Sequence, residues 1–314
     1  MNILVTAIGS MSAECVISTL KKNRHVIIGC DIYPSQWHYE SRLCDKVYLA
    51  PKATDENEYI SFLLNISRKN NIDCIIPLTD LEIDVINKYR HLFISDRIQL
   101  CMPSNDILQI VRNKYKLYEQ FKDDPKVPSI ATYKYNNDEI PSLPLPCIAK
   151  PYNGRSSEGL LFIHNINEFN TIISKSTYIF QEYKEGSIYT VDYIRCRRTE
   201  SNFSIAREEL LRTKNGAGLT VKTTNDPILY DLVTYIGQTL GINGCINMEF
   251  IKQNGQYFLI DINPRFSAGI AFSQMIGYDM VINHLNCFTG KNIDSPIQIK
   301  EHILTKKYQE EILL

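Results

Sequence analysis

Two carboxylates, an amide and a guanidinium are grouped near the end of the chain, on a segment that has the pattern of a β-hairpin. In the hairpin of residues 244–262, alternation places Glu249 on one face of the first strand. In the second strand Asp261 lies on the same face as Asn263, which directly follows the hairpin. Carboxylate and amide oxygens are the ligands that Mg²⁺ prefers in proteins. Arg265 follows directly, and its planar guanidinium is a permanent donor to phosphate oxygens.

The same hairpin could instead present a solvated sheet face with surface ion pairs. Its other residues are strongly apolar, however, so we expect it to be buried. Buried acceptors need a cation or hydrogen-bond partners. The hairpin therefore predicts a site for Mg²⁺ or Mn²⁺, with Glu249, Asp261 and Asn263 as ligands.

Two further segments have the composition of a nucleotide site. Lys150 ends an apolar strand, and the polar loop 153–159 that follows contains glycines and serines whose amides and hydroxyls can surround phosphate oxygens. Residues 178–186 form an apolar strand that ends in a polar segment, which can present one side-chain amide to a purine edge. Taken alone, a glycine-bearing hairpin loop beside a surface lysine explains the first segment equally well. The second segment, by itself, indicates no more than an edge strand with a turn.

The elements that must position these groups change in type along the chain. Up to about residue 104, short apolar strands alternate with amphipathic stretches, which predicts a parallel sheet covered on both faces. Ligands of such sheets bind beyond the carboxyl ends of the strands. Antiparallel strands follow from residue 147 onward. We expect strands at 3–7, 26–31, 73–77, 146–151, 160–164, 178–183, 187–194, 203–211, 244–251 and 256–262, and helices at 12–22, 58–69, 107–121 and 230–240.

The composition limits the class of protein. A chain of 314 residues with 44% hydrophobic and 22% charged residues can form two or three packed units. The net charge of −1 favours neither nucleic acid nor membrane lipid as a partner. No apolar run approaches the ~20 residues of a membrane span, and the amino terminus lacks a signal-peptide pattern, so we expect a cytoplasmic protein. The nine scattered cysteines suit neither a zinc site nor a disulfide framework.

The order of the motifs resembles the ATP-grasp superfamily, with the carbamoyl phosphate synthetase large subunit and biotin carboxylase as relatives in overall pattern. The resemblance implies an ATP-dependent carboxylate–amine ligase that works through an acyl phosphate. It also implies an α/β and α+β fold, in which a Rossmann-like preATP-grasp domain (1–106) precedes a small (107–185) and a large (186–314) ATP-grasp subdomain. The motifs are Arg112-Asn113-Lys114, Ala149-Lys150-Pro151, the loop 153–159, Gln181–Gly186, Asn247-Met248-Glu249 and Asp261–Arg265.

The resemblance assigns roles to individual positions. Glu249, Asp261 and Asn263 match the magnesium ligands, and Arg265 matches the arginine beside the transferred phosphoryl group. Ile188 stands where a glutamate usually holds the ribose, and Asp261 replaces the usual glutamate. The ATP-binding positions are Lys114 and Lys150 on the phosphates, Gly154, Arg155, Ser156 and Ser157 in a flexible flap, and Gln181, Glu182, Tyr183 and Lys184 at the adenine.

The substrates are a small-molecule carboxylate and an amine of unknown identity. Resemblance makes Arg212 an anchor for a carboxylate or phosphate, although Arg207 and Arg212 could equally form a solvated strand face with alternating charges. Thr79, Asp80 and Glu82 could bind an amine or cap a helix. Gly9 and Ser10 complete the substrate candidates at the ends of the first strands, and a homodimer is compatible with the pattern of the relatives.

Two other classes of protein remain open. Gly9 follows the first strand and Asp31 ends the second, as in a NAD(P)-dependent oxidoreductase, but only one glycine stands where that fingerprint has three. The substitutions at Ile188 and Asp261 also fit a non-catalytic ATP-binding protein with a regulatory or scaffold role.

Overall fold

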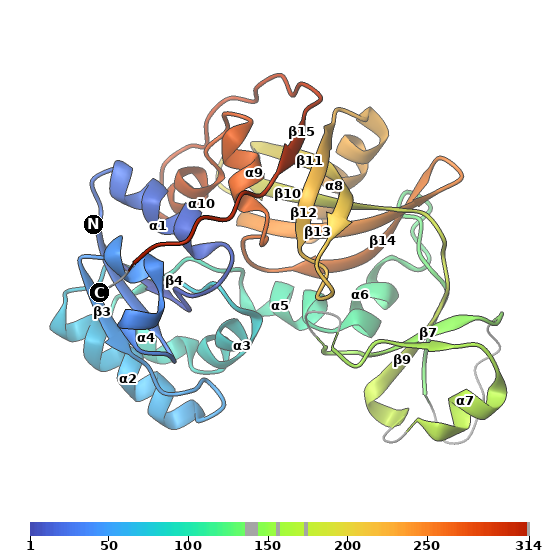
Figure 1. Ribbon diagram of the computed structural model, residues 1–314, viewed down its shortest axis with the longest axis horizontal. Coiled ribbons are helices and arrows are strands. Elements are labelled where there is room, and N and C mark those ends of the chain that lie inside the picture. Colours follow the sequence, from blue (N-terminus) through green and yellow to red (C-terminus); the bar gives the residue numbers. More distant parts are fainter. Residues whose placement is uncertain (136–143, 155–157, 173–174, 313–314) are drawn as a thin grey trace.

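The computed structural model describes residues 1–135, 144–154, 158–172 and 175–312. Its strands form three sheets: one parallel sheet at the amino terminus, a small antiparallel sheet and a larger antiparallel sheet (Figure 1). The predicted combination of a parallel α/β part and later α+β parts is confirmed. Within the described ranges, no helix is long and apolar enough to cross a membrane.

The amino-terminal sheet has five parallel strands in the order β3-β2-β1-β4-β5. Its central strands β1 and β4 consist mostly of buried apolar residues, as expected for a sheet that is covered on both faces. The strand order reverses between β1 and β4, which is where ligand sites of such sheets form. The elements are β1 (Asn2–Thr6), α1 (Ala13–Lys22), β2 (Val26–Asp31), η1 (Ser35–Trp37), η2 (Tyr39–Arg42), β3 (Lys46–Leu49), α2 (Glu56–Lys69), β4 (Cys74–Ile76), α3 (Asp80–Lys88), α4 (Arg90–Ser95) and β5 (Gln99–Leu100).

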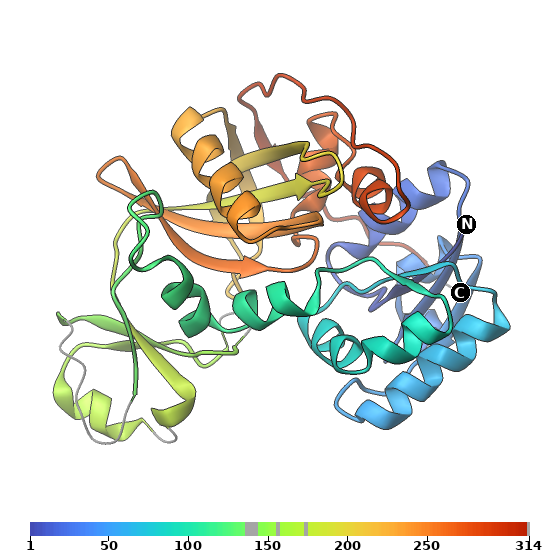
Figure 2. The same cartoon turned by 180° about the vertical axis from the view of Figure 1, so that it is seen from behind.

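Two short helices, α5 (Asn105–Val111) and α6 (Lys114–Phe121), connect this sheet to the rest of the chain (Figure 2). The prediction of one continuous helix over 107–121 is therefore wrong. Asn113 has an extended backbone, and its side chain accepts hydrogen bonds from the second and third residues of α6. An asparagine that caps a helix in this way ends the preceding one. The break makes Lys114 the first residue of α6.

The small sheet is antiparallel, with the order β6-β9-β7-β8. Its core is a separate apolar cluster that includes Phe169 and Phe180. It lies apart from the amino-terminal sheet, on the far side of α5 and α6 (Figure 1). Its elements are β6 (Thr132–Lys134), β7 (Cys147–Pro151), β8 (Leu161–Ile163), α7 (Ile166–Thr171), η3 (Lys175–Thr177) and β9 (Tyr178–Glu182).

The large sheet has six antiparallel strands in the order β14-β13-β10-β11-β12-β15. Helix α8 packs on β10 and β11, while α10 packs on β13 and also contacts α1 of the amino-terminal part. The elements are β10 (Ser187–Arg195), β11 (Asn202–Arg212), β12 (Gly218–Thr224), α8 (Pro227–Thr239), β13 (Gly244–Gln253), β14 (Gln256–Asn263), α9 (Ile270–Met275), α10 (Met280–Phe288) and β15 (Ile303–Thr305).

The amino-terminal and large sheets share apolar cores. Neighbouring residues of β10, Tyr193 and Ile194, belong to two different clusters because they point to opposite faces of the sheet. The cluster of Ile194 continues through α10 into β1 and α1. The end of the chain also returns to the amino-terminal part, where Arg42 donates a hydrogen bond to the carbonyl of Ile312 at 2.8 Å (Figure 1).

Candidate functional site

A β-bulge in the β13–β14 hairpin aligns the two candidate carboxylates. Phe250 pairs with Leu259, but Glu249 pairs with Asp261, so Ile260 is an extra residue in β14. In the unbroken register Glu249 would face Ile260, and Asp261 would point to the other side of the sheet. The bulge thus brings both carboxylates onto one face.

Amide side chains extend this acidic pair along the same face. The Nδ2 atom of Asn263 donates to Glu249 Oε1 at 3.3 Å and to Asn247 Oδ1 at 3.2 Å. Asn247 was not among the predicted ligands, although it precedes Glu249 by two residues and the same alternation could have identified it. Among the described residues, no three His, Cys, Asp or Glu side chains are grouped to hold a metal ion. The candidate metal site therefore consists of two carboxylates and amide oxygens.

The two candidate phosphate lysines come from different elements. Lys114 Nζ lies 2.6 Å from Asp261 Oδ2 and donates to the carbonyl of Gly154 at 3.2 Å. The backbone N–H of Lys114 donates to the carbonyl of Tyr152 at 2.7 Å, which fixes α6 beside the end of β7. Lys150 lies in β7 and is only 8% exposed. The structure thus links Lys114 directly to the acidic face of the hairpin.

Burial and neighbouring charges perturb this group of side chains. Burial, together with the positive charge of Lys114, lowers the pKa of Lys150 to about 8 despite the opposing effect of Asp261 and Glu249. Burial raises the pKa of the Glu249 carboxyl, and the charge of Asp261 adds to this effect. A bound polyphosphate would raise the pKa of Lys150 again, because it supplies negative charge. A divalent cation would lower the pKa of Glu249, because it supplies positive charge.

Arg265 joins the hairpin to the amino-terminal part of the chain. Its Nε and Nη2 atoms lie 3.1 and 2.9 Å from Asp80 Oδ2, and Nη2 lies 3.4 Å from Asn263 Oδ1. Asp80 begins α3, and Arg112 Nη1 lies 3.6 Å from its other oxygen. Burial opposes ionisation of Asp80, but Arg265 and Arg112 hold the pKa of its carboxyl below the ordinary value. Asp80, predicted as an amine ligand or a cap, therefore anchors Arg265.

Arg212 lies beside Glu249, whereas Lys114 lies beside Asp261, the other carboxylate of the pair. Its Nη2 atom is 3.6 Å from Glu249 Oε2, and its Nε donates to the carbonyl of Gly216 at 3.0 Å. With Asp261 and Arg265 these residues line a cleft of about 380 Å³ between the large sheet and the segment that follows β14. The side chain of Arg212 is 28% exposed, so it can contact a molecule bound in the cleft.

Arg207 differs from Arg212 in burial and in partners. Its side chain is fully buried, and Nη1 forms a 2.6 Å ion pair with Asp192 Oδ2. Ser267 and Ser273 accept further hydrogen bonds from the guanidinium at 2.8 and 3.3 Å. Arg207 reaches the wall of the cleft, but its two terminal nitrogens donate to these residues rather than into the open space.

The candidate adenine segment lies at the junction of the small sheet and β14. Gln181 is 8% exposed, and its Nε2 donates to Thr132 Oγ1 at 2.9 Å. The space that it lines with Lys114 and Leu259 is only about 20 Å³, enough for about one water molecule. A purine at Gln181 therefore requires the small sheet to move away from β14.

The neighbours of Gln181 also have partners in the structure. Lys184 Nζ lies 2.6 Å from Glu182 Oε1 and above the ring of Phe258, and Tyr183 packs edge-on against the ring of Phe162. Ile188, where a ribose glutamate was expected, is half-buried in β10 opposite Ile251. The candidates Arg155, Ser156 and Ser157 lie outside the described residues.

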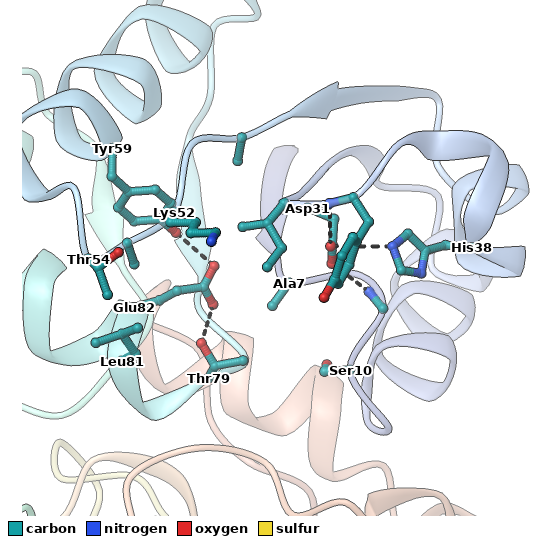
Figure 3. A pocket seen from close by; sticks show the side chains of 15 residues that line it. Ala7, Ser10, Asp31, His38, Lys52, Thr54, Tyr59, Thr79, Leu81 and Glu82 are labelled. Atoms are coloured by element: carbon teal, nitrogen blue, oxygen red, sulfur yellow. Dashed lines mark hydrogen bonds and ion pairs between the residues drawn. The ribbon is translucent and has the colours of Figure 1, made fainter.

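The remaining substrate candidates lie at the carboxyl ends of the amino-terminal strands. The Thr79 hydroxyl donates to Glu82 at 2.7 Å instead of capping α3, and Thr6 and Tyr59 donate to the same carboxylate. Gly9 donates its N–H to Asp31 at 2.9 Å. A Cβ atom on Gly9 would lie 2.4 Å from the ring of His38, so this ring fills the place where a dinucleotide phosphate approaches the glycine in a NAD(P) site. Ser10 lies at the same edge (Figure 3).

Comparison with known proteins agrees with the motif order. A family model for the ATP-grasp domain matches residues 111–269, and one for the PylC-like N-terminal domain matches residues 3–101. The carbamoyl phosphate synthase large chain of Clostridium perfringens is 22% identical over 296 residues, which cover 86% of this chain and 26% of that protein. The chain thus spans about a quarter of the length of this relative. The D-alanine–D-alanine ligase of Petrotoga mobilis is 24% identical over 211 residues, which cover 57% of this chain and 69% of the ligase.

A solved structure supports the same fold. The biotin carboxylase domain of the Hydrogenobacter thermophilus 2-oxoglutarate carboxylase, in complex with MgADP and bicarbonate, superimposes with a TM-score of 0.77. The identity is 15%, and the match covers 93% of this chain and 70% of the other. The ATP-grasp family model includes every candidate phosphate and metal residue from Lys114 to Arg265 and spans about half of the 314 residues. The protein therefore belongs to the ATP-grasp family, with a preATP-grasp domain at its amino terminus.

Proposed function

We propose that this protein is an ATP-dependent ligase that joins a carboxylate to an amine through an acyl phosphate. The observation that carries the proposal is a group of charges at one cleft. The Glu249–Asp261 pair of the hairpin, Asn263 at its end and Arg265 line the cleft, and Lys114 from α6 pairs with Asp261. A dense set of opposite charges beside an open cleft fits a polyphosphate and its cation. One of the relatives, the D-alanine–D-alanine ligase of Petrotoga mobilis, is a ligase by name.

The residues of the hairpin fit a divalent cation. Glu249, Asp261 and Asn263 provide hard oxygen ligands on one face. Burial raises the pKa of the Glu249 carboxyl, and the charge of Asp261 adds to this effect, so a cation at this face would stabilise the ionised form of Glu249. Mg²⁺ bound there would neutralise charge on the phosphates of ATP. Lys114, which now pairs with Asp261, would then be free to contact a phosphate oxygen.

The first chemical step is the attack of a substrate carboxylate oxygen on the γ-phosphorus of ATP. The bond to the β-phosphate oxygen breaks, and ADP leaves with its electron pair. In this proposal Arg265 and Lys150 neutralise the transferred phosphoryl group. The two hydrogen bonds from Arg265 to Asp80 support a fixed orientation of that guanidinium. Phosphorylation is needed because oxide is a poor leaving group for direct reaction with an amine.

The second step is the attack of the amine nitrogen on the acyl carbon. The C–N bond forms, phosphate leaves with the electrons of the C–O bond, and the nitrogen loses a proton. In this proposal Arg212, which lines the cleft beside Glu249, holds a carboxylate or phosphate oxygen of the substrate. No side-chain nucleophile is required.

The proposal is tested by measuring ADP and phosphate release from ATP with pairs drawn from panels of carboxylates and amines. We expect release to require both members of one pair and to be lost in Lys150→Ala and Glu249→Gln. Mass spectrometry of the product should show the mass of the amide. Binding of ATP without release for any pair, or release that both variants retain, would instead favour the non-catalytic ATP-binding alternative that Ile188 and Asp261 suggest.

A further inference from the structure

A second cavity, of about 390 Å³, lies at the carboxyl edge of the amino-terminal sheet (Figure 3). We call it the N-terminal pocket and define it by Ala7 after β1, Asp31 and Ile32 at the end of β2, Lys52, and Leu81 with Glu82 in α3. It spans the point where the strand order reverses between β1 and β4. Its volume lies within the range of small-molecule sites.

Two buried carboxylates face the N-terminal pocket from opposite sides. Figure 3 shows Glu82 with Tyr59 on one side and Asp31 with His38 on the other. The side chains are fixed: Asp31 accepts from the N–H groups of Gly9 at 2.9 Å and Tyr33 at 3.1 Å, and Glu82 accepts from three hydroxyl groups. Each carboxylate thus has a defined orientation and retains capacity for one more donor.

The negative charge of these carboxylates is not balanced by a neighbouring lysine or arginine. Among the described residues, neither Asp31 nor Glu82 forms an ion pair with Lys or Arg, and the contact of Asp31 is with His38 at 3.3 Å. Lys52, the one lysine of the pocket wall, has an exposed side chain and pairs with neither carboxylate. Burial raises the pKa of the Glu82 carboxyl, and the charge of Asp31 raises it further. A cation between the two would relieve both effects.

The wall between the carboxylates is apolar. Ala7, Ile32, Ala50, Ala53 and Leu81 contribute alkyl groups without a hydrogen-bonding side chain. Such a surface suits an aliphatic chain better than a sugar or a phosphate, which need several polar partners. The ligand that fits is therefore a cationic group attached to aliphatic carbons.

The N-terminal pocket is adjacent to a cavity that reaches Arg265 of the proposed reaction site. A neighbouring cavity of about 390 Å³ shares Ser10, Thr79 and Leu81 with it, and is also lined by Asp80 and Arg265. A molecule that occupies both cavities would have one end beside Arg265 and the other between Asp31 and Glu82.

We propose that the N-terminal pocket binds an aliphatic ammonium group of one substrate, at a distance from the group that reacts beside Arg265. This inference rests on the proposed function for the reacting end, and it defines that substrate as an elongated molecule with a non-reacting amine. The ammonium hydrogen-bonds to Asp31 and Glu82, and the alkyl chain packs along the apolar wall.

The single tryptophan of the chain lies near this pocket and can report binding by its fluorescence. Trp37 is the only tryptophan, and its ring stacks on Tyr33 with 5.8 Å between centroids and 26° between planes. Tyr33 lines the N-terminal pocket, so a ligand there changes the surroundings of the Trp37 ring. Binding can therefore be followed by tryptophan fluorescence without ATP, and by calorimetry in parallel.

The experiment titrates the protein with 1,5-diaminopentane, pentylamine and pentanoate. We expect both amines to bind and pentanoate not to bind. Removing one charged hydrogen bond in Glu82→Gln should weaken diamine binding about tenfold. Lys52→Met, an exposed change that leaves the fold intact, should strengthen it about threefold because one repulsive charge is removed. Lys291→Met, an exposed lysine outside the pocket wall, is the matched control and should change nothing.

The result distinguishes this inference from the proposed function. Tighter binding of pentanoate than of the amines, weaker amine binding in Lys52→Met, or the lack of both heat and fluorescence change with either amine would overturn the ammonium site. If Glu82→Gln does not fold, the Lys52→Met comparison decides the sign of the charge. Amine binding in a protein that never releases ADP would uphold the pocket while the ligase proposal fails.

Discussion

Lys150 is a proposed phosphate ligand whose pKa is strongly lowered by burial and by a neighbouring charge. It is 8% exposed, and burial together with Lys114 lowers its pKa to about 8. In the free protein it is therefore partly neutral slightly above pH 8. The triphosphate of ATP would favour the charged form and raise this pKa again.

We predict that ATP binding takes up a proton near pH 8.5 through Lys150. Calorimetry in buffers of different ionisation enthalpy measures this uptake, which should approach zero near pH 6.5, where the lysine is already charged. The affinity for ATP should fall as the pH rises through about 8. Lys150→Met should abolish the uptake, whereas the exposed Lys122→Met should retain it. An uptake that is unchanged in Lys150→Met would contradict the placement of Lys150 at the phosphates.

At this scale the sequence predicted residue types better than contacts. Alternation along two strands was enough to propose Glu249, Asp261 and Asn263 as one group. It could not show that Asp80, 185 residues before Arg265, orients that arginine, because such a contact depends on how two sheets pack. Asp31 and Glu82 were likewise visible as separate acids, and only the fold shows that they face one cavity.

Among the elements, the β13–β14 hairpin owes the alignment of its carboxylates to a bulge. The neighbouring strands β10 and β11 are joined by a buried ion pair. The bulge at Ile260 turns a period-two pattern into a facing pair of carboxylates. Arg207 of β11 and Asp192 of β10 lie behind the cleft with no exposed side-chain surface, and Ser273 of α9 donates to the same Asp192 oxygen at 2.6 Å. This pair thus connects the sheet to the segment that carries Arg265.

We predict that Arg207→Met lowers the free energy of unfolding by about 3–5 kcal/mol, because it leaves the Asp192 charge buried without a partner. The double variant Arg207→Met with Asp192→Leu should recover most of this loss, since it removes both charges. Urea unfolding of the two single variants and the double variant measures the effect. A loss below about 1 kcal/mol in Arg207→Met would show that the ion pair does not support the sheet.

Most of the strands that the sequence did not predict are short. The long apolar strands of the large sheet were anticipated to within a few residues, but β3, β5, β6, β12 and β15 were not. Apart from β12, these strands have four residues or fewer, which is too short for a clear periodicity. The break between α5 and α6 depends on the cap at Asn113, which resembles any polar residue within a helical pattern. The proposed domain boundaries 1–106, 107–185 and 186–314 stay a prediction.

In the whole molecule, His284 connects the amino-terminal part to the large sheet. Its Nε2 lies 3.0 Å from the carbonyl of Cys101 after β5, and its Nδ1 accepts the N–H of Cys245 in β13 at 2.8 Å. The acceptor role of Nδ1 requires a neutral ring, and burial lowers the pKa of His284 to about 4. The position of the cleft between the two sheets depends on contacts of this type, which no local pattern encodes.

We predict that acid weakens this junction. Between pH 6.5 and about 4 the unfolded chain binds a proton at His284 that the folded chain does not, so stability falls as the pH drops, by up to about 3 kcal/mol. Urea unfolding across this range measures the slope. The slope should be smaller in His284→Gln and unchanged in the control His302→Gln, an exposed histidine. Equal slopes in all three proteins would contradict the prediction.

The proposed function depends on a divalent cation that the hairpin face holds against the phosphates of ATP. Calorimetry of ATP binding, with Mg²⁺ and with a chelator, tests this most directly, because the experiment needs no substrate. Wild type and the exposed control Glu301→Gln should bind ATP at least about tenfold more tightly with Mg²⁺. In Glu249→Gln the two affinities should be equal, because one charged ligand is lost. Full Mg²⁺ enhancement in Glu249→Gln would contradict the account.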